Sequence, residues 1–202
     1  MKRIFSLLLM VCLAVSAHAQ DLAQSVRQQL AQPQVLRGEF EQSKQVQGFA
    51  RPLVSRGSFV VAKEKGVLWS TAKPFASQLR LTRDEILATQ ANGAVAFRLD
   101  ASKEPAVRVI NGLMFSLLGG DLGGLAEHFR IDGEAGAKGW SLVLTPKSSS
   151  LAKLMSRIEL AGDKYVRSIR IAEANGDQTQ IRFSAQTSEP AALSAEEAQR
   201  FE

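Results

Sequence analysis

Residues 36–43 have the sequence LRGEFEQS, in which apolar or small residues alternate with charged and polar ones. Successive side chains of a β-strand point to opposite faces, so Leu36 and Phe40 fall on one face and Arg37 and Glu41 on the other. This alternation predicts a strand that buries one face against a core and exposes the other to solvent.

The same alternation returns along most of the chain, separated by short polar, glycine or proline breaks. One group of predicted strands covers residues 53–63, 66–70, 78–81, 85–89 and 95–99, and a second covers residues 129–131, 140–145, 155–160, 166–172 and 179–184. The sequence Asn175-Gly176-Asp177 is typical of a tight hairpin between the last two strands. About ten strands in this order predict an antiparallel meander.

Helical spacing appears before, between and after these strands. Leu22, Val26 and Leu30 share one side of a helix that Asp21 can cap and Pro33 ends. A broad apolar stripe on a second helix, which Gly119-Gly120 ends, consists of Ile110, Leu113, Met114, Leu117 and Leu118. A third helix, capped by Asp121, has on one face Leu122, Leu125, Ala126 and Phe129. The spacing Ser194-x-x-Glu197 is typical of a capping box that opens a C-terminal helix.

These elements predict a mainly β fold with helices (α+β), in which one curved antiparallel sheet forms an incomplete barrel covered by short lid helices. A large open sheet under such a lid would leave an apolar hollow. The residues predicted to line it are Phe40, Phe59, Val61, Trp69, Leu79, Leu81, Phe97, Leu142, Leu144, Ile158, Ile169 and Ile171. The alternation by itself favours a dry core filled by these side chains over a hollow.

The N-terminus has the three parts of a secretory signal peptide. Met1-Lys2-Arg3 is basic, residues 4–15 are almost entirely apolar, and Ala17 and Ala19 suit cleavage after Ala19. The apolar run is shorter than the roughly 20 residues of a membrane span. We therefore expect residues 1–19 to be removed and residues 20–202 to form a single domain in a bacterial periplasm or outside the cell.

The composition of the 202-residue chain changes when this segment is set aside. The loss of Lys2 and Arg3 lowers the formal net charge from +5 to +3. The loss of Cys12 and His18 leaves no cysteine and a single histidine, His128. Without cysteine no disulfide can support the fold, so burial of apolar side chains must do so. A hydrophobic content of 45% is too high for a disordered chain.

The residue inventory argues against most enzymatic chemistry. His128 alone cannot supply a tetrahedral zinc site, and its surroundings predict a solvated helix position. The glycine-rich stretch 119–124 lacks the spacing of a phosphate-binding loop. The adjacent carboxylates Asp84-Glu85 and Glu196-Glu197 favour solvated positions over a facing acid/base pair. Basic residues are scattered rather than clustered. We therefore expect no catalytic residue, metal, cofactor or nucleic-acid partner.

Several of these pieces occur together in a recognisable order. Phe40-Glu41-Gln42 follows the first helix, Gly57 opens the second strand, Trp69 precedes Pro74 by five residues, and Leu144-Thr145-Pro146-Lys147 closes a strand after the helical insertion. Joined to the signal peptide, this order resembles the LolA-like family, the periplasmic carriers of outer-membrane lipoproteins and their divergent relatives. The resemblance covers roughly residues 21–185.

The resemblance implies a hollow that receives the acyl chains of a lipoprotein or another lipidated cargo, under a lid that moves to admit and release them. It also implies an inner-membrane donor complex and an outer-membrane acceptor, and we expect a monomer. Each buried CH₂ group contributes about 0.8 kcal/mol, so one acyl chain supplies ample driving force without catalysis. The lid residues would be Leu22, Val26, Leu30, Ile110, Leu113, Met114, Leu117, Leu118, Leu122 and Leu125.

One departure from the family concerns the latch of the lid. In the family the second strand ends in an Arg-Pro pair whose arginine bonds to the lid. Alignment on Gly57 and Trp69 places Lys63-Glu64 at that point. Lysine keeps the charge but lacks the planar fork of donors, so Lys63 is a candidate latch of a different kind, and a solvated strand-end lysine is the alternative. This departure leaves open whether the cargo is a lipoprotein or another acylated molecule.

Two further functions stay open. A binding module of the same fold could sense lipidated proteins or lipids in the periplasm and signal to a membrane partner without carrying cargo. An enzyme acting on lipid would need catalytic groups that the sequence does not display.

Overall fold

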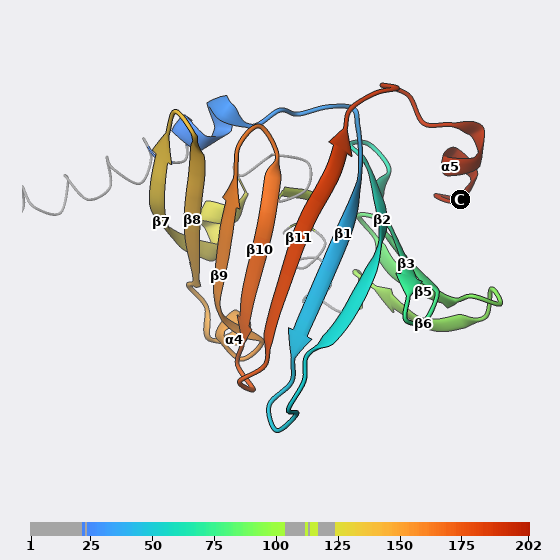
Figure 1. Ribbon diagram of the computed structural model, residues 1–202, viewed down its shortest axis with the longest axis horizontal. Helices are drawn as coiled ribbons and strands as arrows, with labels where there is room; N and C mark the ends of the chain where they lie inside the picture. Colours follow the sequence, from blue (N-terminus) through green and yellow to red (C-terminus); the bar gives the residue numbers. More distant parts are fainter. Residues whose placement is uncertain (1–21, 23, 104–111, 113, 117–123) are drawn as a thin grey trace, which may run out of the picture.

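The protein is described by a computed structural model that covers residues 22, 24–103, 112, 114–116 and 124–202. Eleven antiparallel strands form one open, curved sheet with short helices at its ends (Figure 1). The first six strands are β1 (Val35–Gln45), β2 (Leu53–Ala62), β3 (Gly66–Lys73), β4 (Ser77–Leu81), β5 (Glu85–Gln90) and β6 (Val95–Asp100). The other five are β7 (Phe129–Gly136), β8 (Gly139–Pro146), β9 (Met155–Gly162), β10 (Val166–Glu173) and β11 (Gln178–Thr187).

The strands are arranged in the order β6-β5-β4-β3-β2-β1-β11-β10-β9-β8-β7. Strands that follow each other in the sequence are paired, except β6 and β7, which form the two edges of the sheet. The pairing of β1 with β11 joins the two halves. The predicted fold class, a mainly β protein with one curved antiparallel sheet that does not close, is confirmed. Each predicted strand segment corresponds to one of these eleven strands, with residue 63 alone lying beyond the end of its strand, because alternating burial marks strands of an antiparallel sheet well.

The helices agree less well with the sequence predictions. Helix α3 (Leu125–His128) has Gly124 at its N-cap, and Phe129 already belongs to β7, paired with Pro146 of β8. Ala126 is exposed. The prediction that Ala126 and Phe129 share a buried helix face is therefore wrong, because sheet pairing takes Phe129 out of the helix. Outside the described residues lie the predicted signal peptide, Asp21, Ile110, Leu113, Leu117, Leu118, Asp121 and Leu122.

Two further helices are short and capped by serine side chains. Helix α4 (Ser149–Ala152), which the sequence analysis did not predict, begins where the Ser148 hydroxyl accepts a hydrogen bond from the Leu151 N–H at 3.3 Å. Helix α5 (Ala195–Gln199) has the predicted capping box: the Glu197 N–H donates to Ser194 Oγ at 3.1 Å, and the Ser194 N–H donates to Glu197 Oε2 at 2.8 Å. The cap hydrogen bonds satisfy backbone donors that the first turn leaves free.

The C-terminal segment folds back over the outer face of the sheet beside β2 and β3 (Figure 1). Arg37 of β1 donates to both carboxylate oxygens of Glu197, at 2.7 and 2.6 Å, and to the carbonyl oxygens of Pro190 and Ala192. Arg200 donates to Ser70 Oγ of β3 at 2.6 Å. Between these anchors Leu68, which alternation turns to the outer face, is fully buried. The segment thus covers an apolar position that faces away from the main core.

These contacts contradict the prediction that both adjacent carboxylate pairs are solvated. Hydrogen bonds from Arg37 lower the pKa of Glu197 from 4.5 to about 2, although burial acts in the opposite direction. Glu85 is only partly exposed and forms an ion pair with Arg80 at 2.7 Å. Neither pair forms a facing acid/base arrangement, because each glutamate is turned to an arginine instead.

We expect the ion pair between Arg37 and Glu197 to make stability depend on pH. A depressed pKa in the folded state contributes stability that is present above pH 4.5 and is lost as the pH falls from about 4.5 to about 2. The contribution should be about 1–3 kcal/mol, because these are charge-assisted hydrogen bonds at a partly buried site. Urea unfolding at pH 6 and pH 3 of the wild type and of Glu197→Gln measures it. Glutamine preserves the capping box, so an equal pH dependence in both proteins would contradict the assignment.

Candidate functional site

The inner, concave face of the sheet carries a cluster of four aromatic side chains in its first half. Phe40 of β1 stacks on Trp69 of β3 with ring centroids 3.8 Å apart, and Phe59 of β2 lies 6.3 Å from the same indole. Phe183 of β11 meets Phe59 and Trp69 edge-on, at 5.3 and 6.1 Å. Stacked and edge-to-face rings at these distances pack favourably beyond their apolar area. The cluster therefore joins the strands on both sides of the seam between β1 and β11.

Two glycines make room for these rings. A Cβ atom on Gly38 would lie 2.7 Å from the Phe59 ring, which pairs across from it. A Cβ atom on Gly57 would lie 2.9 Å from the Phe40 ring and 1.9 Å from the Ser70 carbonyl oxygen. Only residues without a side chain fit at such close approaches. Gly57, one of the positions that carries the family resemblance, is thus required by the packing of Phe40 and β3.

The second half of the concave face is aliphatic. The register aligns Leu142, Leu160, Ile169 and Ile181 in one row across β8 to β11. Leu144, Ile158 and Ile171 form the next row. Most of these side chains are buried and belong to the same apolar core as the aromatic cluster.

Residues of the N-terminal helix cover one end of this core. Val26 and Leu30, on or next to helical residues 24–29, are buried, and Leu22 packs against the core while partly exposed. The Ala31 N–H donates to the Lys164 carbonyl oxygen at 2.9 Å, which ties the end of the helical segment to the turn between β9 and β10. Met114 also packs against the core. Predicted lid residues with described positions are thus Leu22, Val26, Leu30, Met114 and Leu125.

Most of the residues predicted to line a hollow point into the core. Phe40, Phe59, Val61, Trp69, Leu81, Leu142, Leu144, Ile158 and Ile169 are buried, and Leu79 and Ile171 are partly buried. Phe97 differs: it lies in the same cross-strand row as Trp69, Leu79 and Ala88, but its side chain is 47% exposed. The exposure follows from its position on β6, the last strand of the sheet.

A cavity of about 770 Å³ opens at the end of the sheet that the helical residues cover. Its wall comes from separate parts of the chain: residues 27 and 32, the β2–β3 turn, the β4–β5 turn, residues 100–102 at the end of β6, and residues 112, 115 and 116. Buried Val61 and Ala101 line it where it meets the apolar core. The cavity thus lies between the core of the concave face and solvent.

The rim of this cavity carries balanced charges. Its cations are Arg27, Lys63 and Arg83, and its carboxylates are Glu64, Asp84 and Asp100. The Ser102 hydroxyl and N–H donate to Asp100 Oδ1 at 2.6 and 2.8 Å, and these hydrogen bonds lower the pKa of Asp100. A charged rim beside the buried apolar residues Val61 and Ala101 suits a molecule with a polar head and an apolar tail.

Lys63 lines this cavity together with Gly112, Phe115 and Ser116. It directly follows β2, its side chain is exposed, and its N–H donates to the Gln34 carbonyl oxygen at 3.0 Å. In the part of the chain that the structure describes, its ammonium group makes no hydrogen bond or ion pair. The candidate latch therefore lies beside the residues that a lid would contribute, and its role as a latch stays a proposal.

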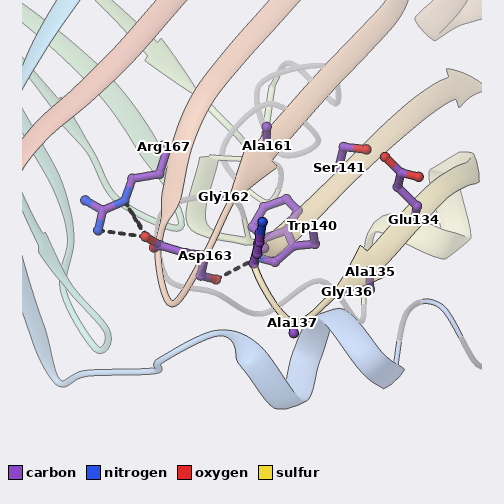
Figure 2. A pocket seen from close by; sticks show the side chains of 12 residues that line it. Glu134, Ala135, Gly136, Ala137, Trp140, Ser141, Ala161, Gly162, Asp163 and Arg167 are labelled. Carbon is purple, nitrogen blue, oxygen red and sulfur yellow. Dashed lines mark hydrogen bonds and ion pairs between the residues drawn. The ribbon is translucent and has the colours of Figure 1, made fainter.

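A second, shallower groove of about 680 Å³ lies at the ends of β7 to β10 (Figure 2). The Trp140 indole N–H donates to the Asp163 carbonyl oxygen at 2.7 Å, and Arg167 donates to the Asp163 carboxylate at 3.1 Å. Burial raises the pKa of Asp163, but hydrogen bonds from the Tyr165 N–H and Arg167 outweigh it and lower that pKa overall. These contacts hold the β7–β8 and β9–β10 turns together near the N-terminal helix. The polar residues of the groove therefore stabilise the turns, and we do not assign them a binding role.

The described residues form no candidate metal site. No three histidine, cysteine, aspartate or glutamate side chains among them gather closely enough to hold a metal ion. His128 ends α3 and is exposed, as the sequence predicts. Within the same residues, no helix is both long and apolar enough to cross a membrane.

Sequence reasoning missed most of the cavity rim. The rim residues are far apart in the sequence and lie in turns or at the ends of helices and strands, so no periodicity connects them. They are Arg27, Arg83, Asp84 and residues 100–102. The order of the strands could have predicted part of the rim. In an antiparallel meander every second turn lies at the same end of the sheet, so the β2–β3 and β4–β5 turns are expected to be neighbours.

Comparison with known proteins extends this description. The family model for outer membrane lipoprotein carrier proteins that are LolA-like matches residues 14–201. No curated protein matches the sequence.

Several solved structures resemble the chain at low sequence identity. A DUF1329 family protein from Desulfovibrio piger is 16% identical, with a TM-score of 0.52 over 92% of this chain and 96% of that one. A LolA superfamily protein from Nitrosomonas europaea is 8% identical, with a TM-score of 0.44 over 84% of this chain and 92% of that one. A putative outer membrane lipoprotein-sorting protein domain from Vibrio parahaemolyticus is 9% identical, with a TM-score of 0.46 over 90% of this chain and 98% of that one. The first of these likenesses supports the fold.

Proposed function

Because the chain belongs to the outer membrane lipoprotein carrier protein LolA-like family, we propose that it carries an acylated molecule, a lipoprotein or a lipid, through the periplasm. The observation that carries this proposal is the cavity of about 770 Å³ that joins a charged rim to the apolar concave face. The acyl chains would lie against the concave face, and the polar head would stay at the rim. An inner-membrane donor complex would load the protein, and an outer-membrane acceptor would unload it.

Driving force for this binding would come from apolar burial alone. Each CH₂ group removed from water contributes about 0.8 kcal/mol, so a chain of ordinary length binds without any reaction. The concave face is filled by the protein's own side chains, so cargo can enter only if a covering element moves. We place this movement in helical residues 24–29, of which only Val26 is buried and which are tied to the sheet by the hydrogen bond from Ala31 to Lys164. Weakly held covering elements of this kind open at low cost.

A reversible lock tests this proposal on the chain without residues 1–19, which contains no cysteine of its own. The Ala31 N–H lies 2.9 Å from the Lys164 carbonyl oxygen, so we choose Ala31→Cys with Lys164→Cys as the disulfide pair and verify its formation by the loss of free thiols on oxidation. We expect the wild type and the reduced variant to bind a fluorescent fatty acid. The oxidised variant should take it up at least tenfold more slowly, and a reductant should restore uptake.

The outcomes separate the parts of the proposal. If neither the wild type nor the reduced variant binds the fatty acid, and no lipid co-purifies with the protein, acyl-chain binding is wrong. If the oxidised and reduced forms bind equally fast, acyl-chain binding stands, but helical residues 24–29 are not the lid. Binding without transfer to acceptor vesicles or proteins would favour the sensor module over the carrier.

A further inference from the structure

The end of the sheet opposite the cavity has a distinct surface. In the meander the β2–β3 and β4–β5 turns line the cavity, so the β1–β2, β3–β4 and β5–β6 turns lie at the other end. Figure 1 shows the β1–β2 hairpin projecting away from the N-terminal helix beyond the rest of the sheet. The register pairs Arg56 with Lys73, which places the β3–β4 turn next to the start of β2.

This end exposes large apolar side chains. Phe75 in the β3–β4 turn is 83% exposed, Phe49 in the β1–β2 turn is 62% exposed, and Leu53 at the start of β2 is 59% exposed. The other exposed large apolar residues among those described lie at or near this end as well, and they are Val54, Val95, Phe97 and Leu154. This gathering of large exposed apolar side chains makes that end of the sheet a candidate interaction surface.

The turns between β1 and β6 at this end carry cations and no carboxylate, and the neighbouring carboxylates Glu173 and Asp177 form ion pairs with Lys44. Residues 42–63, 65–83 and 86–99 contain no aspartate or glutamate. The carboxylates between residues 42 and 99 are Glu64, Asp84 and Glu85, and all three lie in or beside the turns at the cavity end. Arg51 and Lys73 flank the exposed phenylalanines and are themselves exposed. Within the described part of the chain, neither forms an ion pair. We call Phe49, Arg51, Leu53, Lys73 and Phe75 the hairpin rim.

The form of the hairpin rim favours a membrane over a protein partner. A stable protein interface needs a continuous surface of about 800 Å² on each partner, whereas the rim presents single side chains on separate turns. Aromatic side chains settle at the boundary between lipid headgroups and acyl chains, and neighbouring Lys and Arg side chains are attracted to anionic headgroups. These turns contain no carboxylate, and the adjacent Glu173 and Asp177 are paired with Lys44, which limits the repulsion of anionic headgroups.

We propose that the hairpin rim docks the protein on an anionic phospholipid bilayer, with Phe49 and Phe75 entering the interface and Arg51 and Lys73 contacting lipid phosphates. The cavity then faces away from the lipid, so docking and cargo binding use opposite ends of the sheet. This proposal does not depend on the cargo, because the rim is complete without it.

Flotation with vesicles tests the proposal on the chain without residues 1–19 and without any acyl ligand. One set of vesicles contains phosphatidylglycerol and phosphatidylethanolamine, and the other contains phosphatidylcholine alone. We expect binding to the anionic set, at least tenfold weaker binding to the neutral set, and a marked loss in 0.5 M salt. Phe49→Ser with Phe75→Ser, and separately Arg51→Gln with Lys73→Gln, should each lower binding at least fivefold.

The matched control is Lys65→Gln with Lys138→Gln, which removes two exposed cations from turns at the opposite end of the sheet. This control should bind the anionic vesicles like the wild type. Circular dichroism checks that every variant keeps its fold. The proposal is overturned if the wild type does not bind anionic vesicles, if it binds neutral ones equally well, if the rim variants bind unchanged, or if the control loses as much binding as they do. Crosslinking of the rim to an acidic protein, with no vesicle binding, would assign the surface to a protein partner instead.

Discussion

Replacement of Trp69 by alanine is expected to lower the free energy of unfolding by about 3–5 kcal/mol, the usual cost of removing a buried large aromatic side chain. Trp69 is in contact with Phe40 on one ring face and lies near Phe59 and Phe183, so its removal leaves a void between three other rings. The surrounding strands are held in register on both sides and cannot collapse into that void. Urea unfolding followed by far-ultraviolet circular dichroism measures the change.

The control for this experiment is Phe97→Ala. Phe97 occupies the same cross-strand row but is about half exposed on the last strand, so the expected loss is below about 1 kcal/mol. Equal losses at the two positions would show that the aromatic cluster does not organise the core. A loss below about 1 kcal/mol for Trp69→Ala would mean that the void is filled by rearrangement, which contradicts the tight packing described here.

The second large effect is expected at Gly57. Gly57→Ala should cost about 2–3 kcal/mol, because the added methyl group would meet the Ser70 carbonyl oxygen at 1.9 Å and force β2 and β3 apart. The strain cannot be relieved by a side-chain rotation, since the obstructing atom belongs to the backbone of the neighbouring strand. Thermal and urea unfolding of the variant measure the loss, and far-ultraviolet circular dichroism reports whether the sheet survives.

Gly136→Ala is the matched control for Gly57→Ala. Gly136 also lies in a strand, but a Cβ atom there would meet no other atom within 4 Å. Its substitution should change the free energy of unfolding by no more than about 0.5 kcal/mol. If both alanines are tolerated equally, the close approach of β2 and β3 at Gly57 is not a constraint on the fold.

The sequence predicts the strands well because their signal is local. Residues 36–43 and the other alternating segments each show the two-residue period within a few positions, so their inward faces follow without knowledge of their neighbours. The inward positions of Phe40, Phe59 and Trp69 follow in the same way. Their contacts with Phe183, and the need for glycine at residue 38, depend on the register between β1, β2 and β11, which the period alone does not specify.

The predictions that failed depend on contacts between segments that are distant in the sequence. Glu197 was expected in solvent because its neighbour Glu196 is also acidic, but its partner Arg37 lies 160 residues earlier in the sequence. The spacing of Phe129 is compatible with a helix and with a strand. Its pairing with Pro146 places it in the strand β7. The cavity rim likewise gathers residues from turns that are remote in sequence. Each case rests on a contact between distant segments that local patterns cannot reveal.

The single pairing of β1 with β11 has a consequence for how the protein acquires its shape. Every other strand pairs with a neighbour in the sequence, so each half of the sheet can form through short loop closures. The β1–β11 ladder closes the longest loop in the chain and should be the slow step, since loop-closure entropy must be overcome before its contacts form. Phe40 and Phe183 meet only across this ladder. The newly made chain therefore has no complete inner surface until its last strand is in place.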